Sequence, residues 1–217
     1  MLNPWLELPK QSPFILEQDR LFLKEHNNKY GIDLTLLPEP FLGRPNAEIM
    51  LLNLNPGVHE SDIIQHRQAT FQRLNAHNLR HKPNTFPFYL LNPDLKDCPG
   101  YNWWSKKLGS LIRKFGQERV SWKICCVEFF PYHSKCFRFP DSKQLPSQEY
   151  SFYLVRKAIK QGTFIIFMRG QPRWEAAVPE LKTYHNNIVK SVQNPCLTHN
   201  NLSLAVYKKL EAILGEN

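Results

Sequence analysis

Residues 48–57 read EIMLLNLNPG, and this stretch decides the fold. Its apolar core shows no polar alternation, which is typical of a short strand covered on both faces, as in a parallel sheet. The run then stops at Asn-Pro-Gly, a common turn sequence. Three further short apolar runs have the same character: 123–130 (KICCVEFF), 163–168 (TFIIFM) and 187–192 (NIVKSV). We therefore expect four buried strands.

Helical patterns separate these runs along the chain. They cover residues 103–115, 148–161, 171–181 and 204–214, and a looser pattern over 14–30 ends at Gly31. Strands that alternate with helices favour βαβ units with right-handed crossovers. The sequence thus predicts one α/β domain over residues 1–217, folded as a three-layer α/β/α sandwich.

Residues 58–101 form a long excursion between the first strand and the next clear helix. A helix is possible over 63–79, but prolines at 83, 87, 93 and 99 favour irregular structure after it. Long ordered excursions usually serve function. In open α/β sheets the ligand binds at the carboxyl ends of the strands, and this excursion starts there.

The composition favours a soluble protein with a polyanionic partner. Lys and Arg number 28 against 19 Asp and Glu, a net charge of +9, and neutralising phosphates with such cations releases counterions. There is no apolar run of about 18 residues and no basic-then-apolar leader, so we expect a cytoplasmic protein that avoids membranes. A monomer is favoured.

Neither a metal nor an organic cofactor is expected. The five cysteines contain no C-x-x-C pair, so reduced and mostly buried thiols are the simpler interpretation. Four histidines of the excursion stand near two acids, but no pair has the spacing of a zinc protease helix. These residues are His59, Glu60, Asp62, His66, His77 and His81.

Polar or turn-forming residues follow all four apolar runs. The four segments are 53–57 (NLNPG), 128–134 (EFFPYHS), 169–170 (RG) and 194–196 (NPC). Each alone is ordinary turn chemistry. If the four loops converge, they line a crevice with amides, a carboxylate, a guanidinium and aromatic rings.

These motifs resemble those of the uracil-DNA glycosylase superfamily, most closely its single-strand-selective and mismatch-specific branches. Residues 53–57 match the Gly-x-Asn-Pro-Gly loop of the family except that Asn53 replaces the first glycine. Residues 128–132 keep the proline of its Asn-x-Cys-Pro-Leu motif, and 194–196 look like its His-Pro-Ser or Asn-Pro-Ser motif. Gly170 stands where the third strand of the family ends. The resemblance implies a parallel sheet in the order second, first, third, fourth run.

The resemblance also implies roles for individual residues. Asn55 would hold the attacking water and Asn194 would lie near the leaving base, while Pro56 and Gly57 would offer backbone amides at close range. Phe86 or Phe88 would stack on the flipped base, although core packing explains both phenylalanines equally well. The base would also meet Phe130, Arg169 and Gly170, and the DNA would meet Lys135, Pro195 and Cys196.

Glu128 is the clearest departure from the family, which has asparagine there. An asparagine can donate to a uracil carbonyl and accept from the ring N–H, whereas an ionised glutamate only accepts. Three explanations remain open: Glu128 pairs with Arg169 or Lys135, it reads an amino-bearing base, or the pocket no longer handles bases. A buried carboxylate should be paired or have a raised pKa.

Two functions follow as hypotheses. The first is a DNA glycosylase-like hydrolase that acts on a flipped base, with weak or absent excision of ordinary uracil. The alternative is a noncatalytic nucleic-acid or nucleotide-binding module on the same fold. Both place Asn55, Glu128, Phe130 and Asn194 in one crevice with a positive mouth.

Overall fold

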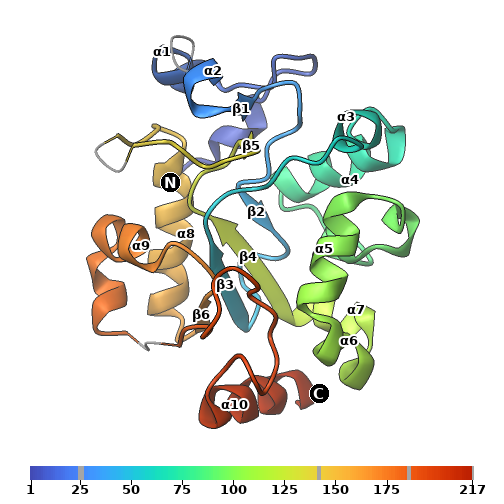
Figure 1. Cartoon of the computed structure of the whole chain (residues 1–217), viewed down its shortest axis with the longest axis vertical. Coiled ribbons are helices and arrows are strands. Elements are labelled where there is room, and N and C mark those ends of the chain that lie inside the picture. Colours follow the sequence, from blue (N-terminus) through green and yellow to red (C-terminus); the bar gives the residue numbers. More distant parts are fainter. Residues whose placement is uncertain (24–26, 141–142, 185–186, 217) are drawn as a thin grey trace.

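The core of the protein is a four-stranded mixed sheet (Figure 1). The structure is a computed structural model that describes residues 1–23, 27–140, 143–184 and 187–216. Two strands, β3 (Ile49–Asn53) and β4 (Ile124–Glu128), pair in parallel at the centre. They are flanked by β6 (Phe164–Phe167), parallel to β3, and β2 (Phe41–Leu42), antiparallel to β4.

The sheet confirms part of the predicted topology and corrects the rest. The second, first and third apolar runs lie side by side in the predicted parallel order. The predicted fourth strand is reduced to one parallel bridge between Ile188 and Phe167, because the next backbone groups bond elsewhere: the Lys190 and Ser191 amides donate to Asn201. The sheet is also not purely parallel, since the two-residue β2 occupies the opposite edge.

Helices cover both faces of the sheet, because alternate strand residues enter two separate cores. Met50, Leu52, Val127 and Ile165 belong to the core on the side of α8 (Gln148–Lys160) and α9 (Gln171–Ala177). Ile49, Leu51, Cys126 and Ile166 belong to the other core. Its helices are α4 (Ala69–Leu79), α5 (Pro99–Lys107), α6 (Gly109–Phe115), α7 (Gln117–Lys123) and α10 (Leu204–Gly215).

The excursion over 58–101 is more ordered than the prolines indicated. It holds α3 (Asp62–Gln65), α4 and two 3₁₀ turns, η3 (Tyr89–Leu91) and η4 (Pro93–Leu95), and ends inside α5. Prolines 93 and 99 each stand in the first turn of such an element, where a missing N–H does no harm. The predicted helix over 103–115 breaks at Leu108 into α5 and α6.

The N-terminal segment is not the single helix predicted over 14–30. It contains η2 (Glu17–Asp19), α1 (Arg20–Leu23) and α2 (Asn27–Tyr30), while residues 24–26 lie outside the described residues. Before it stands η1 (Pro4–Glu7), and after it β1 (Ile32–Asp33) pairs antiparallel with β5 (His133–Ser134). A short turn, η5 (Pro179–Lys182), follows α9.

None of the described helices is long and apolar enough to cross a membrane. All five cysteines are free thiols, and three of them are buried, in line with the sequence-based expectation.

Gly43 is required where β2 meets the central strands. Its φ is +88°, and a Cβ there would lie 2.8 Å from the Ile124 carbonyl oxygen and 3.1 Å from the Cys125 Cα. We expect Gly43→Ala to lower the free energy of unfolding by about 3 kcal/mol, since left-handed backbone and a clash with backbone add. Gly162→Ala is the matched control, because its φ is +72° with nothing within 4 Å. Urea unfolding should show a loss of only roughly 1 kcal/mol in the free energy of unfolding of Gly162→Ala. Equal losses in the two variants would contradict the role assigned to the clash at Gly43.

Candidate functional site

A pocket of about 840 Å³ opens at the carboxyl ends of β3, β4 and β6. Its wall combines residues 53–57 after β3, Glu128 at the end of β4, residues 133–135, and residues 168–172 after β6. This is the edge where parallel α/β sheets bind ligands, and the volume suits a small organic group. Three of the four segments singled out in the sequence therefore converge, whereas the fourth, residues 194–196, does not line the pocket, although Val192 and Gln193 just before it do.

Asn53 and Glu128 form the innermost polar pair of the pocket. They are register partners at the ends of β3 and β4, and each side chain is only 3% exposed. The Asn53 Nδ2 donates to Glu128 Oε1 at 2.9 Å, and the Asn53 carbonyl oxygen is fixed by the Trp174 indole N–H at 2.8 Å. The other two polar atoms, Asn53 Oδ1 and Glu128 Oε2, are buried without a hydrogen-bond partner.

Glu128 is a neutral acid at pH 7. Burial raises its pKa from 4.5 to about 8, and the nearby Glu39 carboxyl raises it further. The Asn53 hydrogen bond and the positive charge of Arg169 act in the opposite direction and are outweighed. The expected raised pKa is thus confirmed, whereas the expected pairing is wrong: the side chains that donate to Glu128 are Asn53 and the Cys126 thiol, not Arg169 or Lys135.

Asn55, Pro56 and Gly57 line the pocket as the sequence predicted. The Asn55 Nδ2 donates to Ser134 Oγ at 2.9 Å and to the Pro56 carbonyl at 2.7 Å, so its amide is oriented by the protein. Gly57 is exposed, and a Cβ there would meet no atom within 4 Å. Backbone at this position is therefore open to close approach by a ligand.

Cations gather around Trp103 at the pocket wall. Arg169 lies over the Trp103 ring at 5.6 Å and donates to the Val192 and Gln193 carbonyls, while Lys107 lies over the ring at 5.1 Å. The exposed Lys135 and the half-buried Gly170 also line the pocket. Gly170 has a φ of +71° and precedes α9.

The phenylalanines chosen from the sequence lie elsewhere. Phe88 is fully buried against Trp104, and Phe130 is fully buried among other rings of the core on the α8 side. Neither lines the pocket, and neither does the half-buried Phe86. Core packing is thus the correct interpretation of Phe88. The partly exposed rings that do line the pocket are Trp103 and Phe137.

The Asn194-Pro195-Cys196 segment also lies outside the pocket wall. Asn194 Oδ1 accepts from Lys107 Nζ at 2.6 Å and from the Cys196 thiol at 3.3 Å, and Pro195 is buried. This arrangement corrects the placement of Asn194 beside a leaving base, because the missing fourth strand lets the segment fold onto α5 instead.

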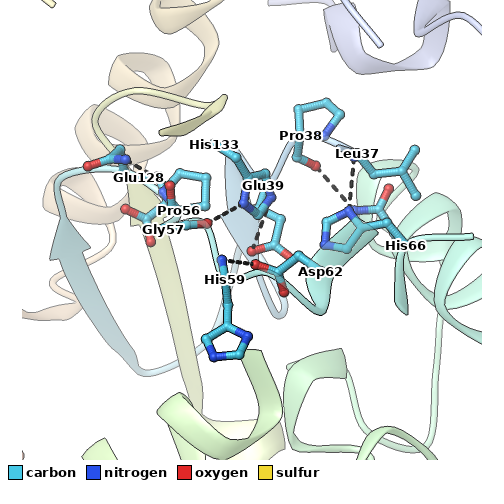
Figure 2. Close-up of polar contacts among 12 residues, drawn as sticks. Leu37, Pro38, Glu39, Pro56, Gly57, His59, Asp62, His66, Glu128 and His133 are labelled. Atoms are coloured by element: carbon cyan, nitrogen blue, oxygen red, sulfur yellow. Dashed lines mark hydrogen bonds and ion pairs between the residues drawn. The ribbon is translucent and has the colours of Figure 1, made fainter. Parts of the chain in front are cut away.

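A second polar group of the pocket was not predicted as a site: Glu39, His66 and His133 (Figure 2). Each offers one ligand-type atom, and these atoms all lie within 4.8 Å of one another. The three side chains come from the segment before β2, the end of α3, and β5. Asp62 borders the group and accepts from the His59 backbone N–H at 2.6 Å.

Hydrogen bonds orient the three side chains. His133 Nδ1 donates to the Gly57 carbonyl at 2.6 Å, and Nε2 of the same ring lies 4.0 Å from Glu39 Oε2. Glu39 Oε1 accepts from the Tyr89 hydroxyl at 2.5 Å. His66 Nδ1 accepts from the Leu37 N–H at 3.0 Å, and burial lowers the pKa of His66 to about 2, so its ring is neutral.

Sequence reasoning found one member of this group, His66, as one histidine among several in the excursion. His133 was noted only as a member of the turn segment 128–134, and nothing in the sequence marked Glu39. The three are brought together by tertiary contacts, such as the Glu39 N–H bonded to the Pro131 carbonyl at 2.9 Å.

No family model, no curated protein and no solved structure matches this chain.

Proposed function

We propose that this protein binds a base flipped out of DNA in the pocket at the carboxyl ends of β3, β4 and β6, and hydrolyses its N-glycosidic bond in the manner of the uracil-DNA glycosylase superfamily. One observation carries the proposal: the pocket wall holds a buried donor–acceptor pair without partners. In a cyclic acid–amide pair the Glu128 Oε2 hydroxyl would also donate to Asn53 Oδ1, but neither of these two buried atoms has a hydrogen-bond partner. Buried polar atoms rarely stay unpaired, so a ligand edge is the natural partner.

The pair selects for a lactam edge, in which a carbonyl stands beside a ring N–H. The neutral Glu128 acid donates from Oε2 to the carbonyl, and Asn53 Oδ1 accepts from the N–H. Uracil, thymine, hypoxanthine and xanthine carry such an edge. The expectation of weak uracil excision assumed an ionised Glu128, and a pKa of about 8 removes that reason.

The same hydrogen bond supports hydrolysis. As the N-glycosidic bond breaks, its electron pair moves onto the base, and negative charge builds on the carbonyl oxygen that Glu128 contacts. Arg169 and Lys135 add positive charge near the leaving base. A water held by Asn55 adds its oxygen to the sugar carbon, and the proton that it loses ends on the base anion, so that the products are an abasic sugar and the free base. Trp103 or Phe137 would stack on the base, a contact worth roughly 1–3 kcal/mol.

Excision assays test the proposal. Oligonucleotides with a single uracil, hypoxanthine or xanthine are incubated with protein and then treated with alkali, which breaks the strand at an abasic site. We expect cleavage of at least one lactam base, and we expect Asn53→Leu and Glu128→Leu to slow it roughly tenfold to hundredfold, because each loses one hydrogen bond to the base. Glu128→Gln, which keeps a donor and an acceptor, is the matched control and should stay active. Equal rates for all four proteins would contradict the assignment of the pair.

A noncatalytic nucleic-acid or nucleotide-binding module is the second candidate. The contacts of the two asparagines assigned to catalysis favour it. Asn194 is held by Lys107 outside the pocket, and the Asn55 amide is already hydrogen-bonded to Ser134. If no lactam base is released while DNA containing it still binds better than normal DNA, this candidate replaces the hydrolase.

A further inference from the structure

The Glu39, His66 and His133 cluster has the composition and geometry of a metal centre. Two imidazoles and one carboxylate are a common donor set for divalent transition metals, which leave further positions open for water or substrate. The ligand-type atoms lie within 4.8 Å of one another, a span that a central ion can bridge with bonds of about 2 Å plus a small inward shift. All three residues line the pocket, so an ion has a path to them.

His133 Nε2 is the atom that points to a missing partner. It is buried and makes no hydrogen bond, while Nδ1 of the same ring donates to the Gly57 carbonyl. Nε2 faces Glu39 Oε2 at 4.0 Å, a separation too long for a direct hydrogen bond. A cation between the two atoms would be a partner for both.

His133 and Glu39 each make, away from the proposed ion, the kind of hydrogen bond that metal ligands usually make. A metal-bound histidine commonly donates its other N–H to a backbone carbonyl, as His133 does to Gly57. A ligating carboxylate is commonly hydrogen-bonded in turn, as Glu39 is to Tyr89. Both ligands are thus oriented before any ion binds.

His66 needs one rearrangement. Its Nδ1 now accepts from the Leu37 N–H, so the neutral ring carries its proton on Nε2. Ligation through Nε2 moves that proton to Nδ1 and ends the Leu37 contact. The ring itself is held in place by stacking on Phe71, with centroids 4.1 Å apart.

We propose that Glu39, His66 and His133 bind one divalent transition-metal ion, with Glu39 and His133 as preformed ligands and His66 as the third. The proposal is independent of base excision, because it concerns side chains other than Asn53 and Glu128 and is tested by binding alone.

Calorimetric titration of Zn²⁺ into chelator-treated protein tests the site. We expect one ion per chain with micromolar or tighter affinity, and a loss of at least a hundredfold in Glu39→Gln and in His133→Asn. Glu39→Gln keeps an acceptor for the Tyr89 hydroxyl, which protects the fold. His59→Asn is the matched control, since His59 lines the same pocket outside the cluster, and it should bind as the wild type does.

Co²⁺ absorption of the wild-type protein gives a second readout that needs no variant. Absorption bands of a four- or five-coordinate nitrogen and oxygen site are expected. In an NMR spectrum of the zinc-bound protein, the Leu37 amide resonance should shift because the amide loses its acceptor, His66 Nδ1. Failure to bind Zn²⁺, affinity unchanged in His133→Asn, or a thiolate charge-transfer band from cysteine ligation would each overturn the proposal.

Discussion

Replacing Glu128 by glutamine is expected to stabilise the protein relative to the wild type by an amount that grows with pH. The folded pKa of Glu128 is raised from 4.5 to about 8 by burial. Below about pH 4.5 the acid is neutral in both states and the fold keeps its full stability. As pH rises from there through 8, the unfolded chain loses the proton first, so the wild type loses stability. By linkage, the wild type loses at most about 5 kcal/mol of its free energy of unfolding over this whole window, of which about 3 kcal/mol is lost between pH 5.5 and 8.

Urea unfolding of both proteins at several pH values measures this effect. The buried acids Glu39 and Asp19 also have raised pKa values, but they are present in both proteins and cancel in the difference. Glu17→Gln makes the same substitution at an exposed side chain and is the matched control. A stability difference that does not change between pH 5.5 and 8 would mean that Glu128 is ionised in the folded protein.

The central strands were predictable because their information is local. Unbroken apolar runs of four or five residues, such as residues 49–52, favour strands covered on both faces in a chain where such runs alternate with helical patterns. The antiparallel strand β2 was not predictable, since Phe41 and Leu42 are too short to show a period. The run over 187–192 looked like a strand, yet its backbone bonds to Asn201, a preference that no apolar pattern records.

The site was predictable only where strand ends determine it. Asn53 and Glu128 end two strands, and parallel pairing makes them neighbours. The hydrogen bond between them was not predicted, because the sequence indicated a charged partner for Glu128. The aromatic rings were placed wrongly because apolar character does not distinguish a core ring, such as Phe88, from a ring at the pocket wall, such as Trp103.

The histidine cluster was not predictable. Its three members stand 27 and 67 positions apart in the sequence, from Glu39 to His66 and from His66 to His133, and belong to no common helix or strand. Metal-site patterns in sequences depend on ligands that share one element. Here the excursion folds back over the sheet and brings His66 to the other two residues.

The central claim is that neutral Glu128 donates to a base. Above its pKa of about 8 the acid loses the donor, so affinity for a lactam base should fall about tenfold per pH unit. Glutamine presents the same donor and acceptor at every pH, so Glu128→Gln should bind almost equally from pH 6.5 to 9. The groups that face Glu128 electrostatically, Glu39, Arg169 and Cys126, are the same in both proteins.

Fluorescence anisotropy of an oligonucleotide with one 2′-fluoro-deoxyuridine, which resists hydrolysis, measures this directly across that pH range. An otherwise identical oligonucleotide with an abasic analogue corrects for backbone binding. The preference for the base over the abasic analogue should fall about fivefold in the wild type between pH 8 and 9, because the protonated fraction of Glu128 falls by that factor, and should stay constant in Glu128→Gln. A preference that follows the same pH course in both proteins, or no preference for the base in either, would contradict it.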